Sequence, residues 1–136
     1  MKKYLWSLIF IFVISNSSYA CEVVGNSWVV RNTQYRYEIA KSNQKCSARY
    51  DLKNSGGRLN FDLLEIIEAS SDGTVLTEIK KNAENDTTLF YTPQSSGEYE
   101  VKYTIRQREI NGNQYDMRYV IKLKVDMKFK DPGSLD

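Results

Sequence analysis

The chain has 136 residues, with 19 Lys and Arg, 17 Asp and Glu, two cysteines and no histidine. Because the first twenty residues hold two of the lysines and none of the acids, residues 21–136 have a net charge of zero. A neutral domain lacks the basic excess that binds phosphate backbones, so we expect no nucleic-acid partner. The absence of imidazole excludes a Ser-His-Asp triad and a histidine metal site, and we expect neither an enzyme nor a bound cofactor.

Residues 1–20 have the pattern of a secretory signal peptide. Two lysines come first, an apolar run covers residues 4–14, and Ser18 and Ala20 put small residues at positions −3 and −1 of a cleavage site. The run is shorter than the roughly 18 residues of a membrane span. We therefore expect cleavage after Ala20, a mature chain without a membrane span, and a periplasmic or secreted bacterial protein. An uncleaved N-terminal anchor is the alternative.

The two cysteines, Cys21 and Cys46, both lie in the part of the chain that would be exported. In an oxidising compartment two cysteines of one chain usually pair, which predicts a disulfide between them. The alternative is a lipid anchor on Cys21, the first mature residue, but Ser18 and Tyr19 fit a lipoprotein signal poorly, so we disfavour it. A metal site made of two thiols without histidine is also disfavoured.

Five short strands are predicted in the first half of the mature chain, because apolar residues alternate with polar ones between turn-forming residues. They cover residues 23–30, 35–39, 46–52, 59–68 and 75–79. The first suits an edge strand with a bulge near Gly25. The fourth also fits a helical turn, but its flanking turns leave room for about a dozen residues, which favours a strand. Polar loops are expected at 41–45, 54–57 and 80–87.

The second half predicts a short strand, a corner between Pro93 and Gly97, and two long strands. In the first long strand, Tyr99, Val101, Tyr103 and Ile105 alternate with polar residues, and in the second every odd position from 115 to 129 is apolar or aromatic. Each long strand therefore has one face for the core and one for solvent.

The two long strands are expected to form a hairpin around Asn111 and Gly112. A two-residue loop would turn their apolar faces in opposite directions, whereas a three-residue loop, 110–112, sets Tyr103 opposite Tyr119. We therefore predict the three-residue loop, with Gly112 in a left-handed conformation.

About seven strands and no convincing helix predict an all-β fold, an antiparallel β-sandwich over residues 21–129 with a flexible tail at 130–136. The segments Asp72–Val75, Leu89–Pro93, Gly97–Ile105 and Tyr119–Val125 resemble bacterial immunoglobulin-like and cadherin-like domains. The resemblance covers residues 59–126 and implies an immunoglobulin-like sandwich. It indicates little about function, because such modules serve many tasks. The chain has neither a second copy nor the acidic calcium-binding linkers of cadherin repeats.

Tyrosines and acids supply the remaining candidate sites. The face with Tyr99, Tyr103, Tyr115 and Tyr119 is either a binding platform or, as we favour, core packing with Tyr99 in a tyrosine corner. The acids at 62, 65, 68 and 72 are expected to be a solvated strand edge rather than a calcium site. The charges on the opposite face are expected to form cross-strand pairs.

These features predict an exported, non-enzymatic module that binds another protein in the cell envelope or in a surface or secretion assembly. Its contact would be an edge strand, either the first or the last. The candidate partner-binding residues are Tyr115, Tyr119, Asn111, Gly112 and Asn113. The alternative is a periplasmic inhibitor or immunity protein that blocks an enzyme with loop 80–87 or 111–114.

Overall fold

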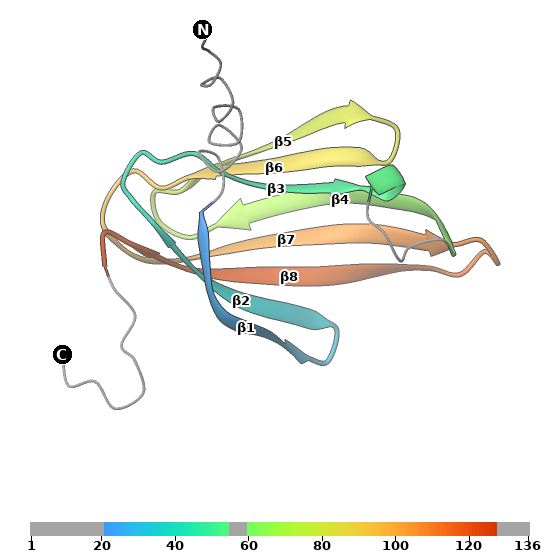
Figure 1. Ribbon diagram of the computed structural model, residues 1–136, viewed down its shortest axis with the longest axis horizontal. Coiled ribbons are helices and arrows are strands. Elements are labelled where there is room, and N and C mark those ends of the chain that lie inside the picture. Colours follow the sequence, from blue (N-terminus) through green and yellow to red (C-terminus); the bar gives the residue numbers. More distant parts are fainter. Residues whose placement is uncertain (1–20, 55–59, 128–136) are drawn as a thin grey trace, which may run out of the picture.

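The computed structural model describes residues 21–54 and 60–127. The predicted signal peptide, most of the 54–57 loop and the 130–136 tail lie outside these residues. The described chain is all-β, with eight strands in two sheets (Figure 1). None of its segments is a helix long and apolar enough to cross a membrane. The strands are β1 (Glu22–Val30), β2 (Thr33–Ala40), β3 (Cys46–Asp51), β4 (Phe61–Ser71), β5 (Leu76–Ala83), β6 (Asp86–Thr92), β7 (Gly97–Glu109) and β8 (Gln114–Val125).

The large sheet has the strand order β1-β2-β8-β7-β4, and the small sheet has the order β3-β6-β5. All neighbouring strands are antiparallel except β2 and β8, which run parallel. The expected antiparallel sandwich is therefore confirmed in its class, with one parallel pair added. The expectation of a free edge on the last strand is wrong, because β8 lies between β2 and β7. The first strand, β1, is an edge strand as predicted.

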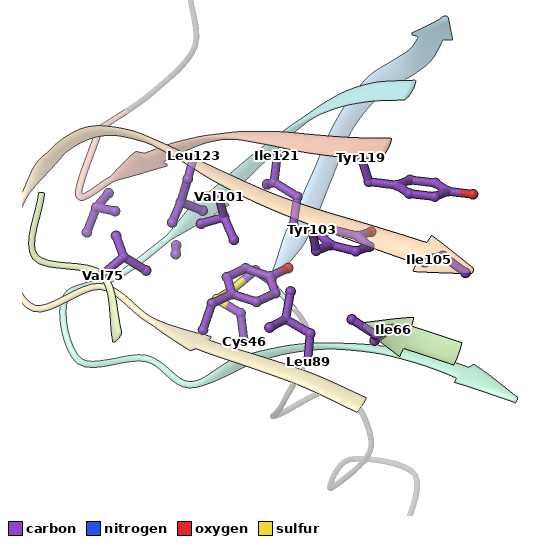
Figure 2. Close-up of a cluster of buried hydrophobic side chains, with 14 of the residues drawn as sticks. Cys46, Ile66, Val75, Leu89, Val101, Tyr103, Ile105, Tyr119, Ile121 and Leu123 are labelled. Carbon is purple, nitrogen blue, oxygen red and sulfur yellow. A yellow bond between two sulfur atoms is a disulfide. The ribbon is translucent and has the colours of Figure 1, made fainter. Parts of the chain in front are cut away.

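The core fills the space between the sheets with the alternate side chains of each strand. Figure 2 shows Val101, Ile121 and Leu123 pointing toward the layer that carries Cys46 and Leu89. Each of these side chains is at most 1% exposed. Burying one large aliphatic side chain stabilises the fold by about 1.5–3 kcal/mol, so the odd positions of β7 and β8 supply much of the driving force.

The β7–β8 hairpin has the predicted register. Tyr103 lies opposite Tyr119. The backbone N–H of Glu109 donates to the carbonyl of Asn113 at 2.8 Å, and the loop between them is 110–112. Gly112 has a φ of 101°, the left-handed conformation that the three-residue loop requires. The two apolar faces consequently point into the same core.

The structure corrects one expected loop and explains one ambiguous segment. The expected loop at 80–87 is wrong: β5 continues to Ala83, and β6 begins at Asp86 after a two-residue turn. The lysines of this segment lie on β5, an edge strand, where charge prevents strand addition.

The ambiguous segment 59–68 belongs to a strand, β4. Register shifts between Phe61 and Leu63 and between Ile66 and Glu68 break its alternation, which is why it also matched a helical turn.

Side chains from the small sheet cover the first half of the outer border of β4. The side-chain oxygen of Asn85 accepts the Leu64 N–H at 3.1 Å, and the Thr87 hydroxyl accepts the Ile66 N–H at 2.9 Å. The Asn85 amide also donates to the Asp62 carbonyl at 3.2 Å. These bonds satisfy backbone groups that an edge strand would otherwise expose.

The predicted disulfide joins Cys21 to Cys46, with 5.2 Å between their Cα atoms. Cys21 directly precedes β1 of the large sheet, whereas Cys46 begins β3 of the small sheet. Both residues are buried in the core. The bond therefore fastens the two sheets to each other at the start of the chain.

The predicted tyrosine corner is present at the start of β7. The Tyr99 hydroxyl lies 3.1 Å from the Ser96 carbonyl oxygen and 3.2 Å from the Ser95 carbonyl oxygen, within hydrogen-bonding distance of both acceptors. The ring packs against Gly73, where an added Cβ would lie 2.7 Å from Tyr99 Cε1. The turn after β4 is thus held against the corner.

Replacing both cysteines by serine should lower the free energy of unfolding by about 3 kcal/mol, because the cross-link spans 25 residues. Urea unfolding of the wild-type chain and the Cys21→Ser/Cys46→Ser variant measures the difference. A loss below about 1 kcal/mol would contradict the proposed contribution of the cross-link.

Gly73→Ala should cost more stability than Gly25→Ala. Both glycines have a φ above 70°, so each substitution carries a backbone strain of about 1–2 kcal/mol. Only at position 73 does the new methyl group also meet a ring, which adds about 1–3 kcal/mol; at Gly25 nothing lies within 4 Å. Equal losses in thermal or urea unfolding would show that the Gly73–Tyr99 packing is unimportant.

Candidate functional site

The outer face of the large sheet, which points away from the small sheet, carries a hollow of about 520 Å³. Ligand sites in proteins commonly have volumes of this order. The hollow extends across β2, β8, β7 and β4. It is lined by Thr33, Tyr35, Glu68, Ala69, Ser70, Glu100, Lys102, Tyr103, Thr104, Arg118, Tyr119, Val120 and Lys122.

The floor of the hollow is formed by two short side chains, Thr104 on β7 and Val120 on β8. Both are only 8% exposed, although they lie on the outer face, where the small sheet does not cover them. Their cross-strand neighbours are longer: Arg118 lies opposite Thr104, and Lys102 lies opposite Val120. Short side chains surrounded by long ones produce a depression in a sheet surface.

Tyr35 forms the wall of the hollow on the β2 side, and Trp28 of β1 supports its ring. Trp28 stacks on Tyr35 with 5.4 Å between the ring centroids and 9° between the planes. The centroids of the Trp28 and Tyr37 rings lie 5.1 Å apart. Tyr35 lies opposite Val120 across the β2–β8 pair. The bulge between Val24 and Trp28 allows Trp28 to lie opposite Tyr35. The stacked rings form a firm, uncharged wall.

Charged side chains surround the rest of the hollow and form the predicted cross-strand pairs. Lys122 Nζ lies 2.8 Å from Glu100 Oε2, and this hydrogen bond raises the pKa of Lys122. Lys102 Nζ is 4.0 Å from the other carboxylate oxygen of Glu100. Among the residues that the structure describes, no carboxylate forms a salt bridge with Arg118.

The structure separates the predicted partner-binding residues. Tyr119 is 7% exposed and stacks on Tyr103 in the core, at 5.1 Å and 8° (Figure 2). Tyr115 is 38% exposed, and its ring lies edge to face with the Phe61 ring, with 6.4 Å between the ring centroids. Asn111, Gly112 and Asn113 are exposed at the end of the β7–β8 hairpin. We call Ile110–Asn113 the hairpin tip; in it, the Asn113 N–H donates to the Asn111 side chain at 2.9 Å.

An interior network of polar side chains was not predicted from the sequence. Arg36 and Glu38 of β2 point into the core, where Glu38 is 3% exposed, while Tyr35 and Tyr37 point outward. Arg36 donates to Glu38 at 2.6 Å and to the Tyr103 hydroxyl at 2.8 Å. The Tyr91 hydroxyl donates to Glu38 at 2.5 Å, and the Tyr50 and Tyr103 hydroxyls lie 2.7 Å apart. The alternation of β2 predicts a strand but does not reveal which set of residues faces inward.

The acids at positions 62, 65, 68 and 72 do not converge on one point. Asp62 pairs with Arg108 at 2.8 Å, and Asp72 accepts the Glu100 N–H at 2.7 Å. Glu68 lies 3.5 Å from the Thr104 hydroxyl. In residues 21–54 and 60–127, no group of three or more acids or cysteines is arranged to hold a metal ion.

Comparisons with protein-family models, with curated proteins and with solved structures found no match to this chain. Its function therefore has to be inferred from the chemistry of its own surface. That inference uses two exposed features of the described chain, the hollow and the hairpin tip. The interior network lies between the sheets, and we assign it a structural role.

Tyr91 and Tyr103 should remain un-ionised until the protein unfolds. Burial raises the pKa of both hydroxyls above the ordinary value of 10.0, with a further increase for Tyr91 from the Glu38 carboxylate. A raised folded-state pKa gives a stabilisation that is complete below pH 10 and is lost as the pH rises further, by about 1.4 kcal/mol per pH unit for each group.

Urea unfolding at a series of pH values above 10 measures this slope, and ultraviolet titration of the folded chain counts the ionising tyrosines. Tyr91→Phe should reduce the slope, because it removes one of the two buried hydroxyls. A Tyr91→Phe slope equal to that of wild type would contradict the burial of an un-ionised hydroxyl at this position.

Proposed function

We propose that the chain is an exported, non-enzymatic module with an immunoglobulin-like sandwich fold, which binds another protein of the bacterial envelope or of a surface or secretion assembly. The hollow on the outer face of the large sheet is the observation that carries this proposal. Its floor is shielded from water without a covering layer, its rim combines Tyr, Arg and Lys side chains, and Trp28 stacks on the Tyr35 of that rim. Trp, Tyr and Arg are the residues most enriched at the energetic centres of protein interfaces.

The strand order supports the immunoglobulin-like part of the proposal. If β2 is taken as the first strand of the sandwich, the second, fifth and fourth strands form the small sheet, and the third, sixth and seventh lie together in the large sheet. Immunoglobulin-type sandwiches divide their second to seventh strands between two sheets in the same way, although their first strand joins the sheet of the second, whereas here it pairs with the seventh. The Tyr99 corner is a second feature that such domains share.

The Cys21–Cys46 disulfide supports an exported location. Disulfides persist in the periplasm and outside the cell, and they are rare in reducing compartments. The bond also supports the choice of disulfide over lipid at Cys21, because the sulfur that a lipid anchor would require is already used. Together with the signal-peptide pattern of residues 1–20, it favours a periplasmic or secreted protein.

The hairpin tip supports a second candidate function, an inhibitor or immunity protein that blocks an enzyme. Ile110 is 64% exposed at the end of the two longest strands. Figure 1 shows this hairpin projecting past the neighbouring strands. A rigid projection that carries an apolar side chain suits insertion into the active site of another protein.

Three arginine substitutions separate the two candidates. Ser70→Arg fills the hollow from an exposed position, Ile110→Arg changes the hairpin tip, and Ala83→Arg is a matched control on the small sheet. Immobilised protein is used to capture a partner from an envelope extract of the source bacterium. We expect Ser70→Arg to reduce the captured partner at least about tenfold, as for the loss of one interface hot spot, and the other two to leave it unchanged.

Thermal unfolding of the three variants verifies that each is folded. Loss of capture with Ile110→Arg alone would favour the inhibitor and overturn the role of the hollow. Equal capture by wild type and all three variants would exclude both surfaces.

A further inference from the structure

Positive charge is concentrated around the floor of the hollow. Val120 is flanked along β8 by Arg118 and Lys122 and lies opposite Lys102 on β7, so three cations surround one buried apolar residue. Glu100 is the acid of this group, and it is shared between Lys122 at 2.8 Å and Lys102 at 4.0 Å. Glu68 lies opposite Thr104, and Asp116, which pairs with Arg106 at 3.0 Å, also attracts Arg118. The residues that line the hollow include three cations and two acids, so the lining has a net positive charge of one.

The β1–β2 half of the hollow carries no charge. Thr33 and Tyr35 line it, the Tyr35 ring stacks on Trp28 of β1, and Lys122 Nζ lies 6.0 Å from the centroid of the Tyr35 ring. A flat apolar or aromatic group would be favoured here, and an anionic group would be favoured one or two strands away. The two halves thus define an oriented ligand with an apolar end and an acidic end.

The spacing of strands relates this ligand to a peptide. Tyr35 and Lys102 are both level with Val120, whereas Arg118 lies two residues along β8. With adjacent strands about 4.8 Å apart, the backbone distance from Tyr35 to a point midway between Arg118 and Lys102 is roughly 8 Å. In an extended chain, side chains two residues apart point the same way and are separated by about 6.8 Å, a similar distance, which favours an extended segment lying across the strands.

We infer that the hollow binds an extended segment of the partner protein in which an aromatic side chain is followed, two residues later, by an acidic one. This inference rests on the proposed function, and it adds the chemistry of the partner to it. The aromatic side chain packs against Tyr35, and the carboxylate lies between Arg118 and Lys102.

Synthetic peptides test the inference on the ¹⁵N-labelled chain as the cell processes it. The first is a capped seven-residue peptide of Gly and Ser with Phe at its third position and Glu at its fifth. The second has Gln in place of Glu, and the third has Glu moved next to Phe. We expect the first peptide to shift the amide signals of Val120, Thr104 and Ser70, with a dissociation constant about tenfold below those of the other two at low salt.

The protein variants Arg118→Gln and Lys102→Gln should each remove most of the preference for Glu, whereas Lys80→Gln, which removes an exposed cation of the small sheet, should keep it. Raising the ionic strength from about 0.05 to 0.5 M should also reduce the preference, because exposed charges are screened. Equal affinity for the Glu and Gln peptides, no binding by any peptide, or signal shifts confined to other surfaces would overturn the inference.

The outcomes also separate this inference from the proposed function. If Ser70→Arg abolishes capture of the partner while the peptides show no preference for Glu, the hollow is an interface and the acidic segment is wrong. If Ser70→Arg leaves capture unchanged and no peptide shifts the signals of the hollow, both proposals are wrong.

Discussion

The pairing of β7 with β8 is the constraint on which the rest of the structure depends. The three-residue loop at 110–112 fixes the register, and the register directs Tyr103, Tyr119 and their alternate neighbours into one core. The same register places Thr104, Val120, Lys102 and Arg118 on the opposite face. A shift by one residue would move the apolar set to solvent and the cations to the interior. One loop length therefore determines both the core and the hollow.

The parts of the fold that depend on local alternation were predictable, and the parts that depend on distant partners were not. The hairpin register, the bulged first strand and the Tyr99 corner follow from spacing within short segments. The parallel pairing of β2 with β8 leaves no mark in either segment, because the apolar pattern of β8 is the same whichever strand lies beside it. The β5–β6 turn was missed because lysines on an edge strand resemble a loop in sequence.

The orientation of β2 explains why the candidate site was not found from the sequence. The alternation of residues 35–39 predicts a strand but not which set of side chains faces inward; in the structure Arg36 and Glu38 occupy the interior and Tyr35 faces the hollow. Charged residues are tolerated there because Glu38 receives hydrogen bonds from Arg36 and Tyr91, and Arg36 also donates to Tyr103. Buried charges are accepted in proteins when such partners satisfy them. The interior network thus allows an aromatic side chain to form the wall of the outer surface.

The two borders of the large sheet are unequal, and this inequality has a consequence for assembly. Asn85 and Thr87 occupy backbone hydrogen-bonding positions along β4, whereas β1 has no strand of the described chain on its far side. β1 therefore offers a foreign strand a border that no other strand of the described chain occupies, in the row next to Trp28. A strand added there would lie beside the Trp28–Tyr35 stack that supports the wall of the hollow. Growth of the sheet and occupation of its outer face would then act on the same pair of stacked rings.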